Sequence, residues 1–216
     1  MSFHLIIPMK KILIPLLLLA AGLFISAAVH HHRWSIKTKP HTLEHPRNIS
    51  LADLIDMTDP PDVSMNDKRY EETLIPHFEN KNKLNEGDLV TTNGYIHLVA
   101  YEDNDQEFHI QISESPTNGD NCFIVEVPDP ANVDDAKLKQ KYEAVRNFIK
   151  EKILFGKEPN KSGNVISGQP FVSVTGQLFF DDAHTHNQIR GKKGMHSNSL
   201  WEIHPIVDMA FAHKPN

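Results

Sequence analysis

The residues Val174–Met209, VTGQLFFDDAHTHNQIRGKKGMHSNSLWEIHPIVDM, contain the pattern on which the expected fold depends. An apolar, β-prone run over residues 171–180 leads into them, and a second such run over residues 200–209 ends them. The loop between the two runs is rich in histidine and lysine. We predict a hairpin that closes a small β-barrel. Because ionisable side chains are costly to bury in a strand, this hairpin is also the first place to look for a ligand site.

Three strands are expected before this hairpin. The first covers residues 89–101 and contains Gly94, and a glycine inside a strand often marks a bulge or a sharp bend. The second shows the alternation of a half-buried strand, with Phe108, Ile110 and Ile112 on one face. The third covers residues 122–127 and ends at a proline.

A helix is expected between the third and fourth strands, within residues 132–155. Apolar side chains recur there at spacings of three and four, which places them on one helix face: Leu138, Tyr142, Val145, Ile149 and Ile153. We expect Asp134 or Asn132 to cap the start of this helix, and Gly156 follows its end.

The resulting order is β-β-β-α-β-β, which resembles the OB-fold, a five-stranded Greek-key barrel. We therefore predict a mainly β protein with one helix and an OB-fold-like barrel over residues 86–213. An open α+β sheet with the helix across one face is the alternative. Residues 29–85 are interrupted by prolines and are expected to form an irregular extension that packs partly on the barrel. Ser50 is expected to cap a short helix within it.

The N-terminal residues have the layout of a secretory signal peptide. Lys10 and Lys11 precede an apolar run, and small residues follow at Ser26 and Ala28. We expect residues 1–28 to be removed by cleavage after Ala28, with Met9 as a possible true start of the chain. The protein would then be exported to the periplasm or the extracellular space. A membrane anchor formed by residues 12–29 is the alternative.

Composition limits the function further. The 216 residues suit one compact domain with an extension. Loss of two lysines with the signal peptide would change the net charge from −6 to −8, which disfavours binding to nucleic acid and other polyanions. Cys122 is the one cysteine in the sequence, so an internal disulfide and a multi-cysteine zinc site are both excluded. We expect this thiol to be a small buried residue.

Four ionisable residues inside apolar strands are candidate metal ligands: His109, Glu126, Glu202 and His204. In a barrel their faces could converge, and imidazole and carboxylate groups suit a divalent metal such as zinc. An open coordination position would then permit hydrolysis. The other interpretation is a buried hydrogen-bond network that fixes the strand register.

The loop of the closing hairpin supplies the second set of candidates. We expect its polar residues to contact a ligand: Asp182, His184, Arg190, Lys192 and Lys193. OB-folds often bind nucleic acid through this loop, but Tyr95 and Tyr101 are the only clear stacking candidates on the predicted sheet face.

Four passages, DQEFHIQI, CFIVEVPDP, VSVTGQLFFDDAH and SLWEIHPIVDM, resemble those of a family of uncharacterised bacterial exported proteins. The resemblance covers residues 88–211 and is most distinctive in Phe108-His109, Glu126-Val127-Pro128 and the Trp201–Pro205 pattern WEIHP. It implies the fold and export, and no reaction. Members usually carry a cysteine just after the Pro-Asp-Pro segment, where this chain has Asn132 or Val133.

We therefore expect a monomeric, exported, non-enzymatic binding domain of the bacterial cell envelope. Its ligand would be an envelope protein, a glycan or a small molecule, and it would contact the membrane only if the signal segment is not cleaved. No nucleophile elbow or nucleotide-binding glycine motif is present in the sequence. A metal-dependent hydrolase resembling a phosphodiesterase is the first alternative, and nucleic-acid or polyanion binding is the second.

Overall fold

The computed structural model describes residues 32–185 and 190–214, and the predicted signal peptide lies outside these residues. The barrel strands are β2 Leu89–Glu102, β3 Glu107–Ser113, β4 Phe123–Val127, β6 Phe171–Phe180 and β7 Trp201–Phe211. The other helices and strands are α1 Trp34–Thr38, β1 Arg47–Asn48, α2 Leu51–Ile55, α3 Ala136–Phe148 and β5 Asn164–Val165. Short 3₁₀ turns cover Lys68–Tyr70, Pro130–Asn132 and Asp182–His184.

The five long strands form a closed barrel in the order β2-β3-β4-β7-β6, with β6 paired back to β2. That closing pair is antiparallel and runs from Leu89 opposite Gln177 to Tyr95 opposite Phe171. Strands β4 and β7 are parallel to each other. This strand order, with α3 between β4 and β6, is OB-fold-like. The barrel prediction is confirmed, and the open-sheet alternative is wrong because β2 and β6 pair.

One face of each barrel strand supplies the hydrophobic core. Phe108, Ile110 and Ile112 alternate along β3, and Val125 and Ile203 occupy the same face of β4 and β7. All five side chains are buried. Successive side chains of a strand point to opposite faces, so the residues between them point out of the barrel.

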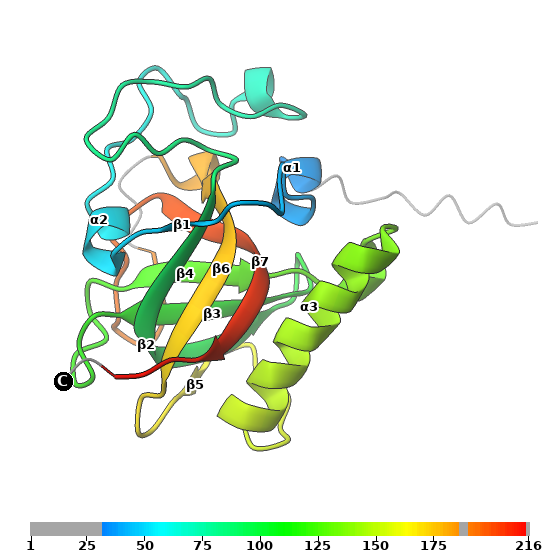
Figure 1. Cartoon of the computed structure of the whole chain (residues 1–216), viewed down its shortest axis with the longest axis vertical. Coiled ribbons are helices and arrows are strands. Elements are labelled where there is room, and N and C mark those ends of the chain that lie inside the picture. Colours follow the sequence, from blue (N-terminus) through cyan, green and yellow to red (C-terminus); the bar gives the residue numbers. More distant parts are fainter. Residues whose placement is uncertain (1–31, 186–189, 215–216) are drawn as a thin grey trace, which may run out of the picture.

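Helix α3 covers the barrel with its apolar stripe, and Figure 1 shows it crossing the sheet obliquely beside β7. The stripe predicted from the sequence is buried along its whole length. The cap is Asp135, whose Oδ1 accepts a hydrogen bond from the Leu138 amide at 2.9 Å, so the predicted caps at Asp134 and Asn132 were wrong. After Phe148 the helix continues as a π-helical turn over Ile149–Ile153.

Strand β2 bends, but its bulge does not lie at the predicted glycine. The register between β2 and β3 shifts between Ile96 and Leu98. Gly94 has a different role, because a Cβ atom there would lie 2.9 Å from Leu51 Cδ2 and 3.2 Å from Ile112 Cβ. The glycine therefore allows the extension to approach the strand closely.

The extension packs against the barrel and shares its core. Leu54 and Leu84 are fully buried in the same apolar cluster as the strands. Ser50 caps α2 as predicted, accepting a hydrogen bond from the Asp53 amide at 3.1 Å. Figure 1 shows the segment between α2 and β2 as a layer above one end of the barrel.

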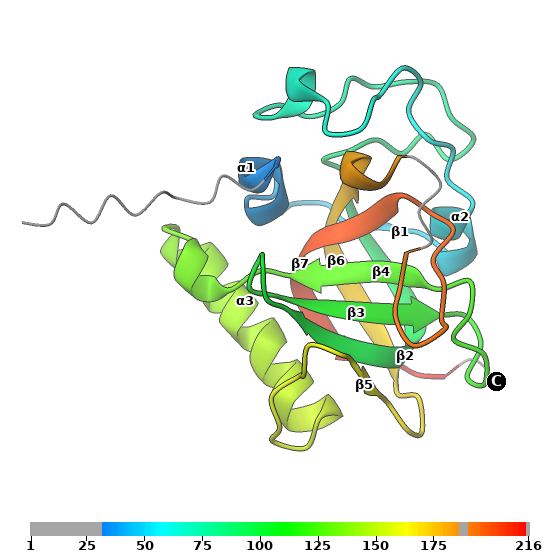
Figure 2. The same cartoon turned by 180° about the vertical axis from the view of Figure 1, so that it is seen from behind.

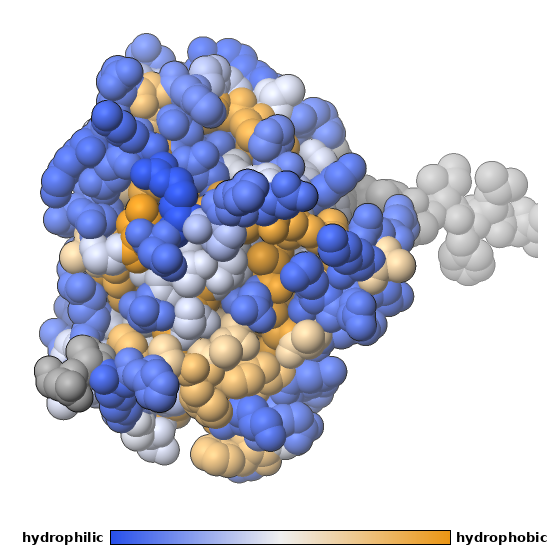
Figure 3. Space-filling view, in the orientation of Figure 1, coloured by the Kyte–Doolittle hydropathy of each residue, from blue (hydrophilic) through white to orange (hydrophobic). Residues whose placement is uncertain are grey.

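The face of the molecule drawn in Figure 3 carries an apolar region. Figure 3 shows apolar side chains gathered in its lower half, over the area where Figure 1 places β5, β6 and β7. Phe211, the last residue of β7, is exposed and makes an edge contact with Phe148, with ring centroids 5.0 Å apart. Over residues 32–185 and 190–214, no helix has the length and apolar character needed to cross a membrane.

Candidate functional site

A cavity of about 400 Å³ lies on the outer face of β3, β4 and β7. The β2–β3 turn borders it on one side and the β6–β7 loop on another, and Figure 2 shows residues 190–200 of that loop beside β3 and β4. Its lining is dominated by ionisable groups: Lys37, Glu102, Asn104, Asp105, Glu107, His109, Ile124, Glu126, Asp181, His184, Arg190, Gly191, Lys192 and Glu202. OB-folds use this face and these two loops to bind ligands.

Strand alternation explains why this face is polar. Glu107 and His109 stand on β3 with the opposite orientation to Phe108, the core residue between them. His109 is paired in register with Glu126 on β4, and the parallel pairing of β4 and β7 places Glu202 beside Ile124. Three neighbouring strands therefore bring glutamate and histidine side chains together, and all of them are buried.

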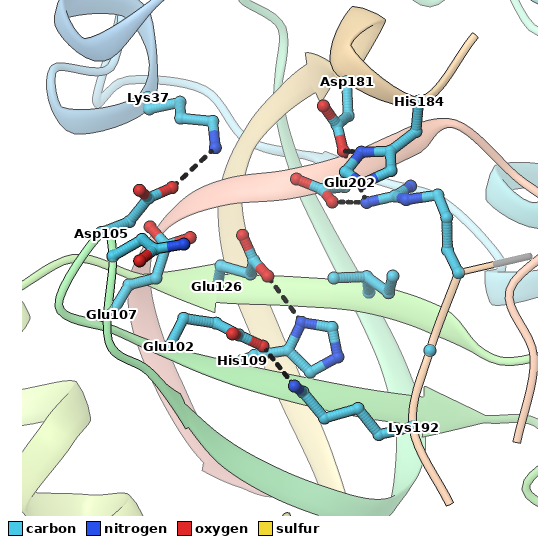
Figure 4. A pocket seen from close by; sticks show the side chains of 14 residues that line it. Lys37, Glu102, Asp105, Glu107, His109, Glu126, Asp181, His184, Lys192 and Glu202 are labelled. Carbon is cyan, nitrogen blue, oxygen red and sulfur yellow. Dashed lines mark hydrogen bonds and ion pairs between the residues drawn. The ribbon is translucent and has the colours of Figure 1, made fainter. Parts of the chain in front are cut away.

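We call five of these residues the floor cluster: Glu107, His109, Glu126, Glu202 and His204. His109 Nδ1 is 2.6 Å from Glu126 Oε1, which is a short hydrogen bond. His204 Nδ1 lies 3.2 Å from Glu126 Oε2, and His204 Nε2 lies 3.2 Å from Glu107 Oε2. Figure 4 shows Glu126 and His109 pointing toward each other across the strands.

Several floor atoms are close to partners but poorly aligned with them. Among the described residues, neither ring nitrogen of His204 has a hydrogen-bond partner, although both are near carboxylates. The same holds for Glu107 Oε2 and Glu202 Oε2. The floor cluster therefore contains close ion pairs whose geometry falls short of good hydrogen bonds.

The charges in the floor cluster shift one another's ionisation. Burial and the charge of Glu126 raise the pKa of Glu107. Burial opposes ionisation of Glu126, but His109 and His204 hold its pKa well below the usual value. Burial alone would lower the pKa of His204, and Glu107 and Glu126 raise it to about 9. The two carboxylates therefore favour the protonated form of His204 at neutral pH.

The rim of the pocket differs from the floor, because each basic side chain there is already paired. Lys37 Nζ is 3.4 Å from Asp105 Oδ2, and Lys192 Nζ is 2.9 Å from Glu102 Oε1. The guanidinium group of Arg190 contacts two carboxylates. It pairs with Glu202 and lies 3.1 Å from Asp181 Oδ2.

The β6–β7 loop is held in place by β3. The Gln111 side chain accepts a hydrogen bond from the Lys192 amide at 2.7 Å and donates one to the Met195 carbonyl at 3.1 Å. Gly191 has a φ of +102°, and a Cβ atom there would lie 2.2 Å from the Met195 carbonyl oxygen. Only glycine fits this position without a shift of the backbone.

Helix α1 brings Lys37 to the pocket, and a buried ion pair fixes the start of that helix. Arg33 Nη1 is 2.9 Å from Glu86 Oε1, and Arg33 Nη1 also donates to the Phe180 carbonyl at 3.0 Å. Asp182 supports the same region by accepting hydrogen bonds from the Asp67 amide and from His32. The first described residues of the chain therefore contribute Lys37 to the lining of the site.

The structure brings together most of the residues predicted from the sequence. His109, Glu126 and Glu202 line the cavity, and His204 lies in contact with them. Three of the predicted ligand contacts near the β6–β7 loop also line the cavity: His184, Arg190 and Lys192. Asp182 instead contacts the extension, and Lys193 is not among the lining residues. Whether any of them binds a ligand stays a prediction.

Several lining residues were missed, among them Glu107, Lys37, and Glu102 and Asp105 of the β2–β3 turn. Glu107 shares the orientation of His109 on β3, so strand alternation could have identified it. Lys37 had no local signal, because it reaches the pocket from a helix far away in the sequence. Comparison of the sequence with known protein families and with curated proteins finds no match. Function is therefore inferred from the site alone.

Proposed function

We propose that this protein is an exported binding protein, without catalytic activity, that holds a small cationic ligand in its outer-face pocket. The excess of carboxylates in the floor cluster supports this most directly. Among the described residues, no lysine or arginine forms an ion pair with Glu107 or Glu126, whose ion-pair partners are histidines. A cation at this position would stabilise both carboxylates. Residues 9–28 support export.

The same distribution of charge argues against a polyanionic ligand. Each basic side chain of the rim already contacts a carboxylate, so a phosphate would have to displace an internal partner. The net charge of −6 would also repel nucleic acid. These features favour a cation over an oligonucleotide on this OB-fold surface.

The main competing interpretation is a floor cluster that only fixes the strand register, and an apolar replacement tests it. We would change Glu107→Met, Glu126→Met and His204→Leu together. Replacing a buried charge cluster with apolar groups of similar volume is often stabilising, by about 1–4 kcal/mol. If the cluster exists for binding, the triple variant keeps the fold and unfolds at a higher temperature in calorimetry. A cluster needed for strand register would instead give a less stable or misfolded protein.

Calorimetric titration of the purified protein tests the proposed ligand class. The probes are Mg²⁺, Ca²⁺, Mn²⁺, Zn²⁺, putrescine, spermidine and free arginine. At least one should bind the wild type, and the triple variant should bind it at least tenfold more weakly. A lack of binding to every probe, or equal binding by the triple variant, would overturn the proposal.

A metal-dependent hydrolase is the second candidate, and one observation favours it. The cavity beside the floor cluster is large enough for a small substrate next to a bound ion. Turnover of bis(p-nitrophenyl) phosphate by metal-loaded wild type, lost in Glu126→Gln, would favour this function over simple binding.

A further inference from the structure

We infer that the cation is a divalent transition-metal ion such as Zn²⁺, held by one carboxylate oxygen each of Glu107 and Glu126 and by one ring nitrogen of His204. This rests on the proposed function, because it identifies the cation that the pocket would hold. The three residues come from three adjacent strands, β3, β4 and β7, so a rigid sheet positions all of them.

The donor atoms are already close enough for small movements to complete a site. One donor atom from each of the three residues lies within 4.8 Å of the other two. For three atoms at that spacing there is always a point within about 2.8 Å of all of them, and metal bonds to nitrogen and oxygen are about 2.0–2.2 Å long. Each side chain would move by less than about 1 Å, which a small rotamer adjustment supplies.

Unsatisfied buried atoms give an independent indication of a ligand. His204 is fully buried, and neither ring nitrogen has a well-aligned hydrogen-bond partner among the described residues, although each lies 3.2 Å from a carboxylate oxygen. Glu107 Oε2, 3.2 Å from His204 Nε2, is in the same condition. Buried polar groups in folded proteins are nearly always satisfied. A metal ion between these donors would satisfy a nitrogen and an oxygen at once.

The neighbouring side chains are placed to support such a site. His109 holds one oxygen of Glu126 through the 2.6 Å contact, which leaves the other oxygen directed at His204. Glu202 Oε2 lies 3.6 Å from His204 Nδ1, so a small approach would let it accept a hydrogen bond from that nitrogen when Nε2 binds the metal. Carboxylate partners of this kind orient metal-binding histidines in many proteins.

The donor set determines the class of metal. Imidazole nitrogen with carboxylate oxygen suits zinc and similar first-row ions, whereas calcium and magnesium prefer oxygen alone. Three protein ligands also leave at least one coordination position free, and the adjacent cavity of about 400 Å³ gives room for a water or a second small ligand there.

The experiment compares the wild type with Glu107→Gln, Glu126→Gln and His204→Gln after removal of metal with EDTA. Zn²⁺ is titrated by calorimetry, and Co²⁺ is added separately because its visible absorption reports nitrogen and oxygen coordination. The wild type should bind one Zn²⁺ at this site, and each variant should bind it at least tenfold more weakly. Circular dichroism identifies any variant that fails to fold. Glu107→Gln and Glu126→Gln are the variants least expected to do so, because both keep the side-chain volume.

Matched controls separate this site from other histidines and acids. Glu143→Gln makes the same change on the exposed face of α3, and His77→Gln does so at an exposed histidine. Both should bind Zn²⁺ like the wild type. Zn²⁺ binding that survives in all three floor variants would overturn the inference. Binding of a polyamine but not of a metal would overturn it while leaving the proposed function intact, and binding of neither would remove both.

Discussion

The two faces of strands β3, β4 and β7 are equally buried and chemically opposite. The inner face carries apolar side chains such as Ile110 and Val125, which lie in the core cluster. The outer face carries Glu107 and Glu126, which lie under the extension and the β6–β7 loop. Burial of the inner face stabilises the fold, whereas burial of ionisable groups opposes it. The barrel therefore owes its stability to one face and holds its candidate site on the other.

The largest expected difference in the free energy of unfolding is between substitutions at two buried residues, which lie three positions apart on β3. Ile110→Ala should lower the free energy of unfolding by about 3–4 kcal/mol, because it removes apolar contacts and leaves a cavity in the core. Glu107→Gln should change it by less than about 1 kcal/mol, because burial and Glu126 already disfavour the Glu107 charge. Urea denaturation at pH 7, in the absence of metal, measures both values. A decrease of more than 3 kcal/mol in the free energy of unfolding of Glu107→Gln would mean that the outer face stabilises the fold.

The inner face was also the part that the sequence predicted best. Alternation placed β3 correctly, because each apolar residue indicates which face of the strand it occupies, and an apolar, β-prone run placed β6. The bulge was misplaced at Gly94 because a register shift depends on two strands at once, and the sequence shows only one. The helix cap was misplaced because several capping residues stand close together there, and only Asp135 has the required geometry.

The outer face was predictable only in part. His109, Glu126 and His204 were found because polar residues inside apolar strands are unusual and share an orientation. Lys37 was not, because its position depends on the buried pair of Arg33 and Glu86, which are distant in the sequence. Contacts between distant segments leave no periodic signal.

A smaller effect on the free energy of unfolding is expected at the rim of the pocket. Substitution of Asp181 there tests how the stability of the outer face depends on pH. Burial opposes its ionisation, but His184 and Arg190 hold its pKa at about 2, below the ordinary value of 3.8. The carboxylate therefore contributes stability above about pH 4, and this contribution is lost as the pH falls through 2. Asp181→Asn should lose about 2 kcal/mol at pH 7, and its difference from wild type should shrink toward pH 2.

Urea unfolding at pH 7 and at pH 3 measures this change. Asp103→Asn is the control, because Asp103 forms an exposed ion pair with Lys161 and should contribute less than about 1 kcal/mol. A difference for Asp181→Asn that does not depend on pH would mean that the rim is held by packing and not by charge.

The smallest expected effect concerns the β6–β7 loop, which covers the outer face. The reactivity of the Cys122 thiol measures whether this loop stays in place. The Cys122 amide donates to the His196 carbonyl of this loop at 2.9 Å, and burial raises the pKa of the Cys122 thiol to about 11. The native thiol should therefore react slowly with a disulfide reagent at pH 8. Gly191→Ala should speed this reaction at least tenfold, because its Cβ atom would displace the Met195 carbonyl.

Gly168→Ala is the matched control for this measurement. Gly168 also has a positive φ, of +75°, but a Cβ atom there would have no neighbour within 4 Å. Both substitutions carry the backbone penalty of a side chain at positive φ, about 1 kcal/mol, and only Gly191→Ala disturbs the cover of the site. Equal acceleration in the two variants would mean that Cys122 reacts through global unfolding. Acceleration in Gly191→Ala alone would show that the outer face can be uncovered while the inner face keeps the barrel folded.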